Sequence, residues 1–162
     1  MSKSKKGLIN SLWEKLGLGN SQVVSFTSLN PKAFKQNKVE FSTDIKLNVN
    51  LITSSDDILN LPKCHQNLIT SDINYNNFFL IYVSLNEAKR IGSEIKIEEI
   101  IIEDEEVIVE VLVYSATNQL SLGMINSPYD LVKINRSQLM LTDDLEFKFI
   151  DYQGQLITQL TL

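Results

Sequence analysis

The residues best suited to chemistry are the single cysteine and the single histidine, Cys64 and His65, which are adjacent in the chain. A Cys–His nucleophile pair needs side chains that face each other, whereas neighbours on an extended chain point in opposite directions. A zinc site would need two further good ligands, and the sequence holds no other cysteine or histidine. The sequence therefore favours a loop thiol and an exposed imidazole over a catalytic or metal role.

A dense group of acidic residues lies in the middle of the chain. Such a group binds Ca²⁺ where its spacing supplies the ligands, or it attracts a basic partner. The Asp-x-Asp-x-Asp-Gly skeleton of an EF-hand is absent. We therefore expect a solvated strand face and turn, with a basic partner as the alternative. The group comprises Glu94, Glu98, Glu99, Glu103, Asp104, Glu105, Glu106 and Glu110.

Three further carboxylates, Asp143, Asp144 and Glu146, are candidates for paired acid–base work. No second catalytic residue type accompanies them, and a turn before a strand explains them equally well. The six glycines are scattered and form no phosphate-binding loop. Because no nucleophile–base pair or metal set can be assembled, the sequence predicts a protein that is not an enzyme and needs no cofactor or metal.

Composition narrows the class of protein further. The 162 residues suffice for one domain with a substantial core. The net charge of -5 argues against wrapping nucleic acid, and no apolar run approaches the roughly 20 residues that span a bilayer. A single cysteine makes no internal disulfide. We expect a cytoplasmic protein with neither a nucleic-acid partner nor a small-molecule substrate.

Residues 1–20 form a separate, basic segment with four lysines against one glutamate. Their apolar residues recur at the spacing of one helical face, which predicts an amphipathic helix of about three turns. An isolated helix of this length is marginal in water, so it needs a surface to bind. The residues predicted to bind a partner or membrane are Lys3, Lys5, Lys6, Leu8, Ile9, Leu12, Trp13 and Leu16.

Two interpretations of this helix stay open. It packs on its own domain or on a neighbouring subunit, or it lies on an anionic membrane surface with Trp13 at the interface. A signal peptide is disfavoured because polar residues break the apolar stretch and no small-x-small cleavage site follows. Ser2 takes the place of the glycine that N-myristoylation requires.

Residues 21–162 are predicted to form one β-rich domain. A strict period of two runs from Val39 to Leu51, which indicates one long strand or two strands joined by a bend near Thr43–Asp44. The stretch from Ser55 to Leu61 is typical of helical turns. The remaining strand candidates are Gln22–Thr27, Phe78–Leu85, Glu94–Ile102, Glu106–Ser115, Tyr129–Ile134 and a hairpin over Leu145–Leu162.

These strands follow one another with little helix between them. A parallel sheet needs crossover helices, so the sheet is expected to be mainly antiparallel. The predicted fold is therefore a mainly β, antiparallel β-sandwich or open barrel with a short N-terminal amphipathic helix.

One stretch resembles a known family. An aromatic residue, Phe78, opens an apolar strand, a loop with Gly92 leads into an Ile-rich strand, and Pro128-Tyr129 opens a later strand. These features resemble the C-terminal domain of the PrcB-type family, the bacterial accessory subunits of protease complexes. The resemblance covers about residues 54–137. The family's loop usually carries a Thr-Gly-Gly-Tyr-like element, and this chain has Arg-Ile-Gly-Ser-Glu at 90–94.

The resemblance implies a β-rich, non-catalytic interaction domain. Together with the basic helix, it predicts an accessory subunit or adaptor that docks through its N-terminal helix to a larger protein complex or a membrane surface. The alternative is a protease-binding or inhibitor-like domain that acts through loops 87–93 and 115–128.

Overall fold

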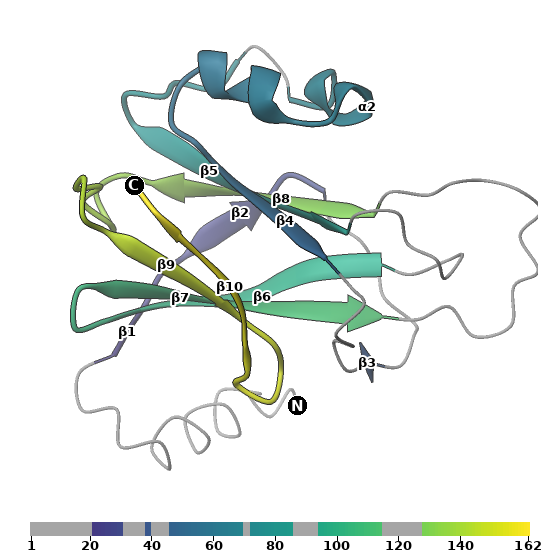
Figure 1. The fold of residues 1–162 in the computed structure, drawn as a ribbon. Coiled ribbons are helices and arrows are strands. Elements are labelled where there is room, and N and C mark those ends of the chain that lie inside the picture. Colours follow the sequence, from purple (N-terminus) through teal and green to yellow (C-terminus); the bar gives the residue numbers. More distant parts are fainter. Residues whose placement is uncertain (1–20, 31–37, 40–45, 70–71, 86–93, 115–127) are drawn as a thin grey trace, which may run out of the picture.

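The computed structural model describes residues 21–30, 38–39, 46–69, 72–85, 94–114 and 128–162. Within these ranges the chain is mainly β, as the sequence predicts, with very little helix (Figure 1). The strands are β1 (Gln22–Val23), β2 (Phe26–Ser28), β3 (Lys38–Val39), β4 (Leu47–Ile52), β5 (Phe78–Leu85), β6 (Glu94–Glu103), β7 (Glu106–Tyr114), β8 (Tyr129–Asn135), β9 (Glu146–Ile150) and β10 (Leu156–Thr161). The helices are the 3-10 helix η1 (Asp56–Asn60) and the single turn α2 (Lys63–Gln66).

The strands form two sheets. Sheet A has the order β1-β6-β7-β9-β10, with β3 also paired to β7, and sheet B has the order β2-β8-β5-β4. The described strand pairs are antiparallel except β7 with β9, which run parallel. Neither order returns to its first strand, so the described strands close no barrel.

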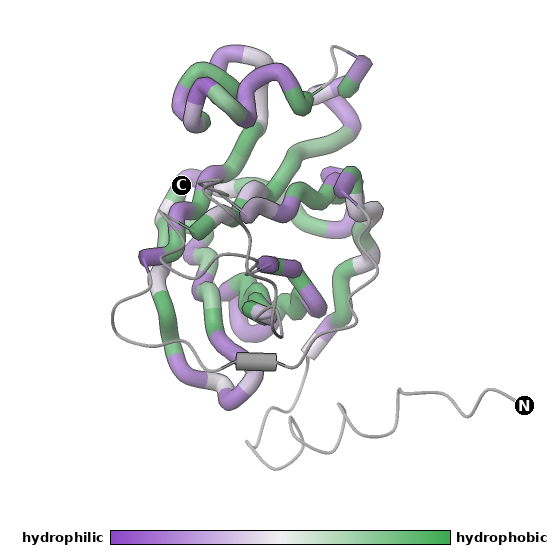
Figure 2. The backbone as a smooth tube through the Cα atoms, turned by 90° about the vertical axis from the view of Figure 1, so that its right-hand side faces the viewer, coloured by the Kyte–Doolittle hydropathy of each residue, from purple (hydrophilic) through white to green (hydrophobic). Residues whose placement is uncertain are grey.

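The main core lies between the two sheets. Alternate residues of β5 and β7 point inward and are buried, because side chains alternate faces along a strand. β9 adds Phe147 and Phe149, both fully buried. Figure 2 shows that hydrophobic and hydrophilic stretches follow each other along the chain. The inward set from β5 and β7 is Phe79, Ile81, Val83, Leu85, Val107, Val109, Val111 and Val113.

A second, smaller core covers the outer face of sheet B. The segment with η1 and α2 lies over β4 and β5 (Figure 1), and we call this covering segment, residues 53–69, the lobe. Leu61 and Ile69 of the lobe pack with Leu80 and Leu131 of the sheet. Because both faces of β5 are buried, one in each core, its sequence is a continuous hydrophobic run.

Two hairpin turns are formed as the sequence predicts. Between β6 and β7, Asp104 and Glu105 both have positive φ, of 44° and 73°, as a two-residue turn of type I′ requires. Between β9 and β10, the Asp151 carboxylate accepts hydrogen bonds from two backbone N–H groups within the turn. Gly154 has a φ of 80°, which glycine adopts without strain.

Some predicted boundaries differ from the structure. The Val39–Leu51 pattern includes two strands in different sheets, β3 and β4, and the predicted bend near Thr43–Asp44 lies outside the described residues. The Gln22–Thr27 strand is likewise split between the sheets, as β1 and β2. The predicted N-terminal helix lies outside the described residues.

Candidate functional site

The residues predicted to dock the chain lie outside the described residues: Lys3, Lys5, Lys6, Leu8, Ile9, Leu12, Trp13 and Leu16. The described chain begins beside them, at β1. There Gln22 and Val23 pair with Ile102 and Ile101 at one edge of sheet A. Residues 1–20 therefore join the described fold at the edge of a sheet.

The two loops of the alternative prediction, 87–93 and 115–128, start and end beside each other. In sheet B, Ser84 pairs with Tyr129, and the Leu85 N–H donates to the Pro128 carbonyl oxygen at 3.0 Å. In sheet A, Glu94 pairs with Tyr114. Each loop thus has one end on each sheet, and the pairing brings the ends of both loops together.

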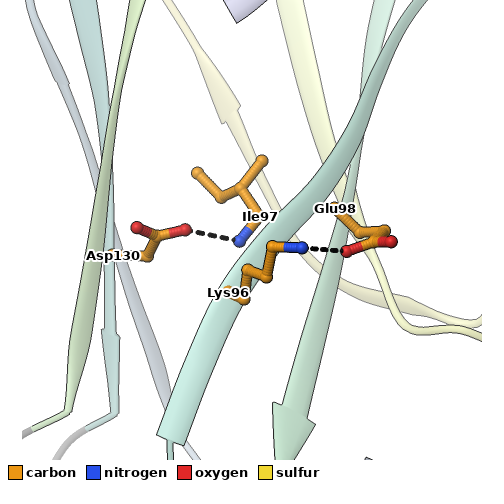
Figure 3. A network of polar contacts seen from close by, with 4 residues as sticks. All are labelled: Lys96, Ile97, Glu98 and Asp130. Carbon is orange, nitrogen blue, oxygen red and sulfur yellow. Dashed lines mark hydrogen bonds and ion pairs between the residues drawn. The ribbon is translucent and has the colours of Figure 1, made fainter. Parts of the chain in front are cut away.

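A buried carboxylate joins the two sheets close to these loop ends. The Asp130 side chain, 3% exposed, accepts a 2.8 Å hydrogen bond from the Ile97 N–H of sheet A (Figure 3). It accepts another from the Leu131 N–H of its own strand. The ladder of β6 and β7 is irregular between Ile97 and Glu99. A β-bulge leaves backbone groups out of the ladder, and Asp130 supplies an acceptor at this point.

His65 is the centre of a small aromatic cluster on the outer face of sheet B. α2 places His65 inward, 7% exposed, and leaves Cys64 exposed. His65 Nδ1 lies 2.5 Å from the Tyr82 hydroxyl, and the centroids of the His65 and Tyr129 rings are 4.6 Å apart. The imidazole predicted to be exposed is therefore buried, because the irregular segment after Pro62 forms a helical turn over the sheet.

Burial raises the pKa of Tyr82, and nearby Cys64 and Tyr129 act in the same direction, while a hydrogen bond with Ser84 opposes them. Burial also raises the pKa of Tyr129, with the Asp130 charge adding to it. Both phenols consequently stay protonated through the neutral range. The hydroxyl groups of Ser84 and Tyr82 and the imidazole of His65 all have a hydrogen-bond partner if Ser84 donates to the Tyr82 oxygen and Tyr82 donates to the imidazole.

Ser84, Tyr82 and His65 are linked by hydrogen bonds, and acid–base sites contain chains of the same kind. A nucleophilic role for Cys64 would require its thiol to reach the imidazole. The Cys64 side chain is instead exposed, whereas the His65 side chain is buried against Tyr82. The geometry is therefore that of a hydrogen-bonded packing contact that holds the lobe on the sheet.

The other end of the lobe is held by an arginine. Arg136, just after β8, donates to the carbonyl oxygens of Tyr75, Phe78 and Thr53 at 2.8, 3.3 and 3.0 Å. These carbonyls belong to two parts of the chain, the start of the lobe and the turn that leads into β5. A guanidinium has five N–H donors in a planar fork, so one side chain can fix all three.

Asp57 organises the start of η1. Its carboxylate accepts hydrogen bonds from the Thr53 N–H at 2.7 Å, the Thr53 hydroxyl at 2.9 Å and the Ser54 N–H at 2.9 Å. Burial opposes ionisation, but these hydrogen bonds outweigh it and lower the pKa of Asp57. Ser55 precedes η1 and makes no side-chain hydrogen bond to it, so Asp57 is the residue that ties η1 to the two residues before Ser55.

The acidic group lies along β6 and β7, and several of its members face basic neighbours or solvent. Lys96 pairs with Glu98 (Figure 3), and Lys148 pairs with Glu106 at 2.7 Å. Asp104 and Glu105 are exposed in the hairpin turn. The turn is solvated, as the sequence favours, but Glu99 departs from a solvated strand face because its Oε2 atom is buried.

Among the described residues, no group of three His, Cys, Asp or Glu side chains is placed to hold a metal ion. Asp143 and Asp144 are exposed in a turn before β9, where the Leu145 N–H donates to the Thr142 carbonyl oxygen. Across the described ranges of the chain, no helix is long and apolar enough to cross a membrane.

The sequence analysis missed Asp130 and the Tyr82–His65 contact. Aspartate is depleted in strands, so its place in the predicted strand Tyr129–Ile134 was the available signal for a special role. No comparable signal marks Tyr82, which looks like any aromatic residue in an apolar strand. No family model, curated protein or solved structure matches this chain.

Proposed function

We propose that this chain is a non-catalytic protein-interaction module, built as an antiparallel β-sandwich. It acts as an accessory subunit or adaptor and docks through residues 1–20 onto a partner complex or a membrane surface. Trp13 and its apolar neighbours supply the contact, and Lys3, Lys5 and Lys6 supply the attraction to acidic groups.

The observation that supports docking by this segment is the position of β1. β1 is an edge strand of two residues, and its Val23 side chain is 57% exposed. A segment connected to the edge of a sheet can contact another surface without disturbing the core between the sheets. The lone exposed thiol of Cys64 favours a reducing compartment, which agrees with a cytoplasmic protein.

The test changes the predicted helix within the full chain. The double variant Leu12→Glu, Trp13→Glu should lose a stoichiometric partner, or lose binding to vesicles with anionic lipid, because charge on the apolar face opposes burial. Partners are isolated separately from membrane and soluble fractions. The matched control, Leu59→Glu with Leu68→Glu, changes two exposed apolar residues of the lobe and should leave binding intact. Equal binding by both double variants would refute the docking role.

A second candidate function follows from the positions of the loop ends. A protease-binding or inhibitor-like domain would grip its target with loops 87–93 and 115–128, as the PrcB-type resemblance suggests. The supporting observation is that strand pairing gathers the ends of both loops at one end of the sheets, bridged by Asp130. Loops on a rigid scaffold are a common place for binding residues.

This candidate is tested with a panel of proteases and the purified full chain. Replacing residues 115–127 by a Gly/Ser segment of equal length should abolish any inhibition, whereas the Leu12→Glu, Trp13→Glu variant should retain it. A chain that leaves every protease in the panel fully active, and that binds none of them, would contradict this function.

A further inference from the structure

We infer that the outer edge of β10 pairs with the β10 edge of a second copy of this chain, in an antiparallel, two-fold symmetric dimer. This inference does not rest on the proposed function. β10 ends the strand order of sheet A, and among the described residues its ladder partner is β9 alone. The outward backbone groups of an edge strand are a template for another strand.

The register identifies which backbone groups point outward. The Leu162 N–H donates to the Leu145 carbonyl oxygen, and Leu160 pairs with Phe147 in the same ladder. Backbone groups alternate direction along a strand, so those of Leu160 and Leu162 face β9. The N–H and C=O groups of Gln159 and Thr161 therefore face away from β9, toward the open edge.

These outward groups are complementary to a copy of themselves. With a two-fold axis at Leu160, Gln159 of one copy lies opposite Thr161 of the other, and the reverse pair forms by symmetry. Each such pair exchanges two backbone hydrogen bonds, giving four in total. Because the same patch is used twice, the contact closes as a dimer and does not propagate into a fibre.

Charge favours a second copy at this edge over the rest of the surface. The chain carries a net charge of -5, so two copies repel each other over most of their surface. The stretch from Tyr152 to Leu162 holds no Lys, Arg, Asp or Glu. Natural edge strands are usually protected by charge, proline, a bulge or short length, and beyond its bulge β10 has no charge or proline from Thr158 to Thr161.

The other edges of the two sheets are less open to this pairing. β1 and β2 are two and three residues long. β4 is six residues long, but it follows the exposed Lys46 and carries two asparagines, a residue type that is depleted in strands. A bulge between Leu156 and Thr158 ends the regular part of the β10 edge, so pairing is confined to the stretch from Thr158 onward.

The inference is tested by sedimentation equilibrium of the full chain over a range of concentrations from micromolar to millimolar. We expect a reversible monomer–dimer equilibrium. The double variant Gln159→Lys, Thr161→Lys places like charges opposite each other twice and should weaken the dimer roughly tenfold or more. Both side chains are exposed, so folding should be unaffected, which far-UV circular dichroism checks.

Two further variants make the test specific. Asn60→Lys with Asn67→Lys changes the net charge equally at exposed positions of the lobe and should leave the dimer unchanged. Thr161→Pro removes one outward N–H without touching a bond to β9, and it should also weaken the dimer. A chain that stays monomeric at every concentration overturns the inference. So does a dimer that the double lysine variant leaves intact.

Discussion

β5 allows a direct comparison of the two cores, because its alternate residues belong to different ones. Phe79, Ile81 and Val83 point between the sheets, while Leu80 and Tyr82 point outward under the lobe, and all are buried. The inner face meets a second sheet that is held by its own ladder. The outer face meets a 3-10 helix and a single helical turn.

The two faces also differ in chemistry. The main core between the sheets, here called the inner core, is apolar apart from its end, where Asp130 joins the sheets. The smaller core under the lobe, here called the outer core, contains the hydrogen-bonded pair of His65 and Tyr82. Apolar side chains in a core need only pack closely against their neighbours. A buried polar side chain also needs a hydrogen-bond partner in the right place. We therefore expect the inner core to determine stability and the lobe to be the part that opens first.

The largest expected loss of stability comes from truncating a buried residue of β5, and it differs between the two cores. Ile81 and Leu80 are neighbours of similar size, and both are fully buried. Ile81→Ala should destabilise the fold by about 4 kcal/mol, because sheet A cannot collapse into the cavity. Leu80→Ala should cost about 2 kcal/mol, since the short helices of the lobe can shift to fill the space. Urea unfolding measures both, and an equal or greater loss for Leu80→Ala would show that the lobe is as rigid as the second sheet.

The next largest loss of stability is expected at Asp130, the polar contact at one end of the inner core. Asp130→Ala removes the acceptor of two backbone N–H groups and should cost about 1–3 kcal/mol. Asp130→Asn keeps one acceptor oxygen in place of two and should lie between the wild type and Asp130→Ala. The control, Asp144→Ala, removes a charge at an exposed turn position. If all three variants unfold at the same urea concentration, Asp130 does not join the sheets energetically.

A smaller effect is expected in the outer core. Tyr82→Phe removes the hydroxyl that lies against His65 and should cost about 0.5–1.5 kcal/mol. Burial raises the Tyr82 pKa, so the stability this residue contributes is complete below the ordinary value of 10.0 and is lost as pH rises through the folded-state pKa. Unfolding free energies measured from neutral to alkaline pH should therefore fall less steeply in Tyr82→Phe. A matching slope in the wild type would contradict this role of Tyr82.

The inner core was largely predictable from the sequence. Its strands carry strict alternation, as in Val107, Val109, Val111 and Val113, and their hairpin turn is acidic and short. These are local signals, which the chain shows without its neighbours. The parallel pairing of β7 with β9 could not be foreseen, because it joins segments that are far apart in the sequence.

The outer core was much harder to predict. His65 reads as a loop residue, since one helical turn gives no periodicity and its partner Tyr82 lies in a strand 17 positions away. Arg136 likewise holds three carbonyls that no sequence pattern marks. Contacts of this kind depend on tertiary placement, so from the sequence the candidate site could be inferred only as two loops, 87–93 and 115–128, and the basic segment 1–20.

The smallest effect concerns the start of the lobe. Hydrogen bonds from Thr53 and Ser54 lower the Asp57 pKa, so its contribution is present above the ordinary carboxyl value of 3.8 and is lost as pH falls through the folded-state pKa. Asp57→Asn keeps an acceptor but loses the charge, and it should cost about 0.5 kcal/mol at neutral pH and nothing in acid, where the wild type is protonated too. The change should appear as faster amide exchange in η1 with little change in β7, because the lobe opens without the inner core. Equal acceleration in both elements would mean that the two cores open as one unit.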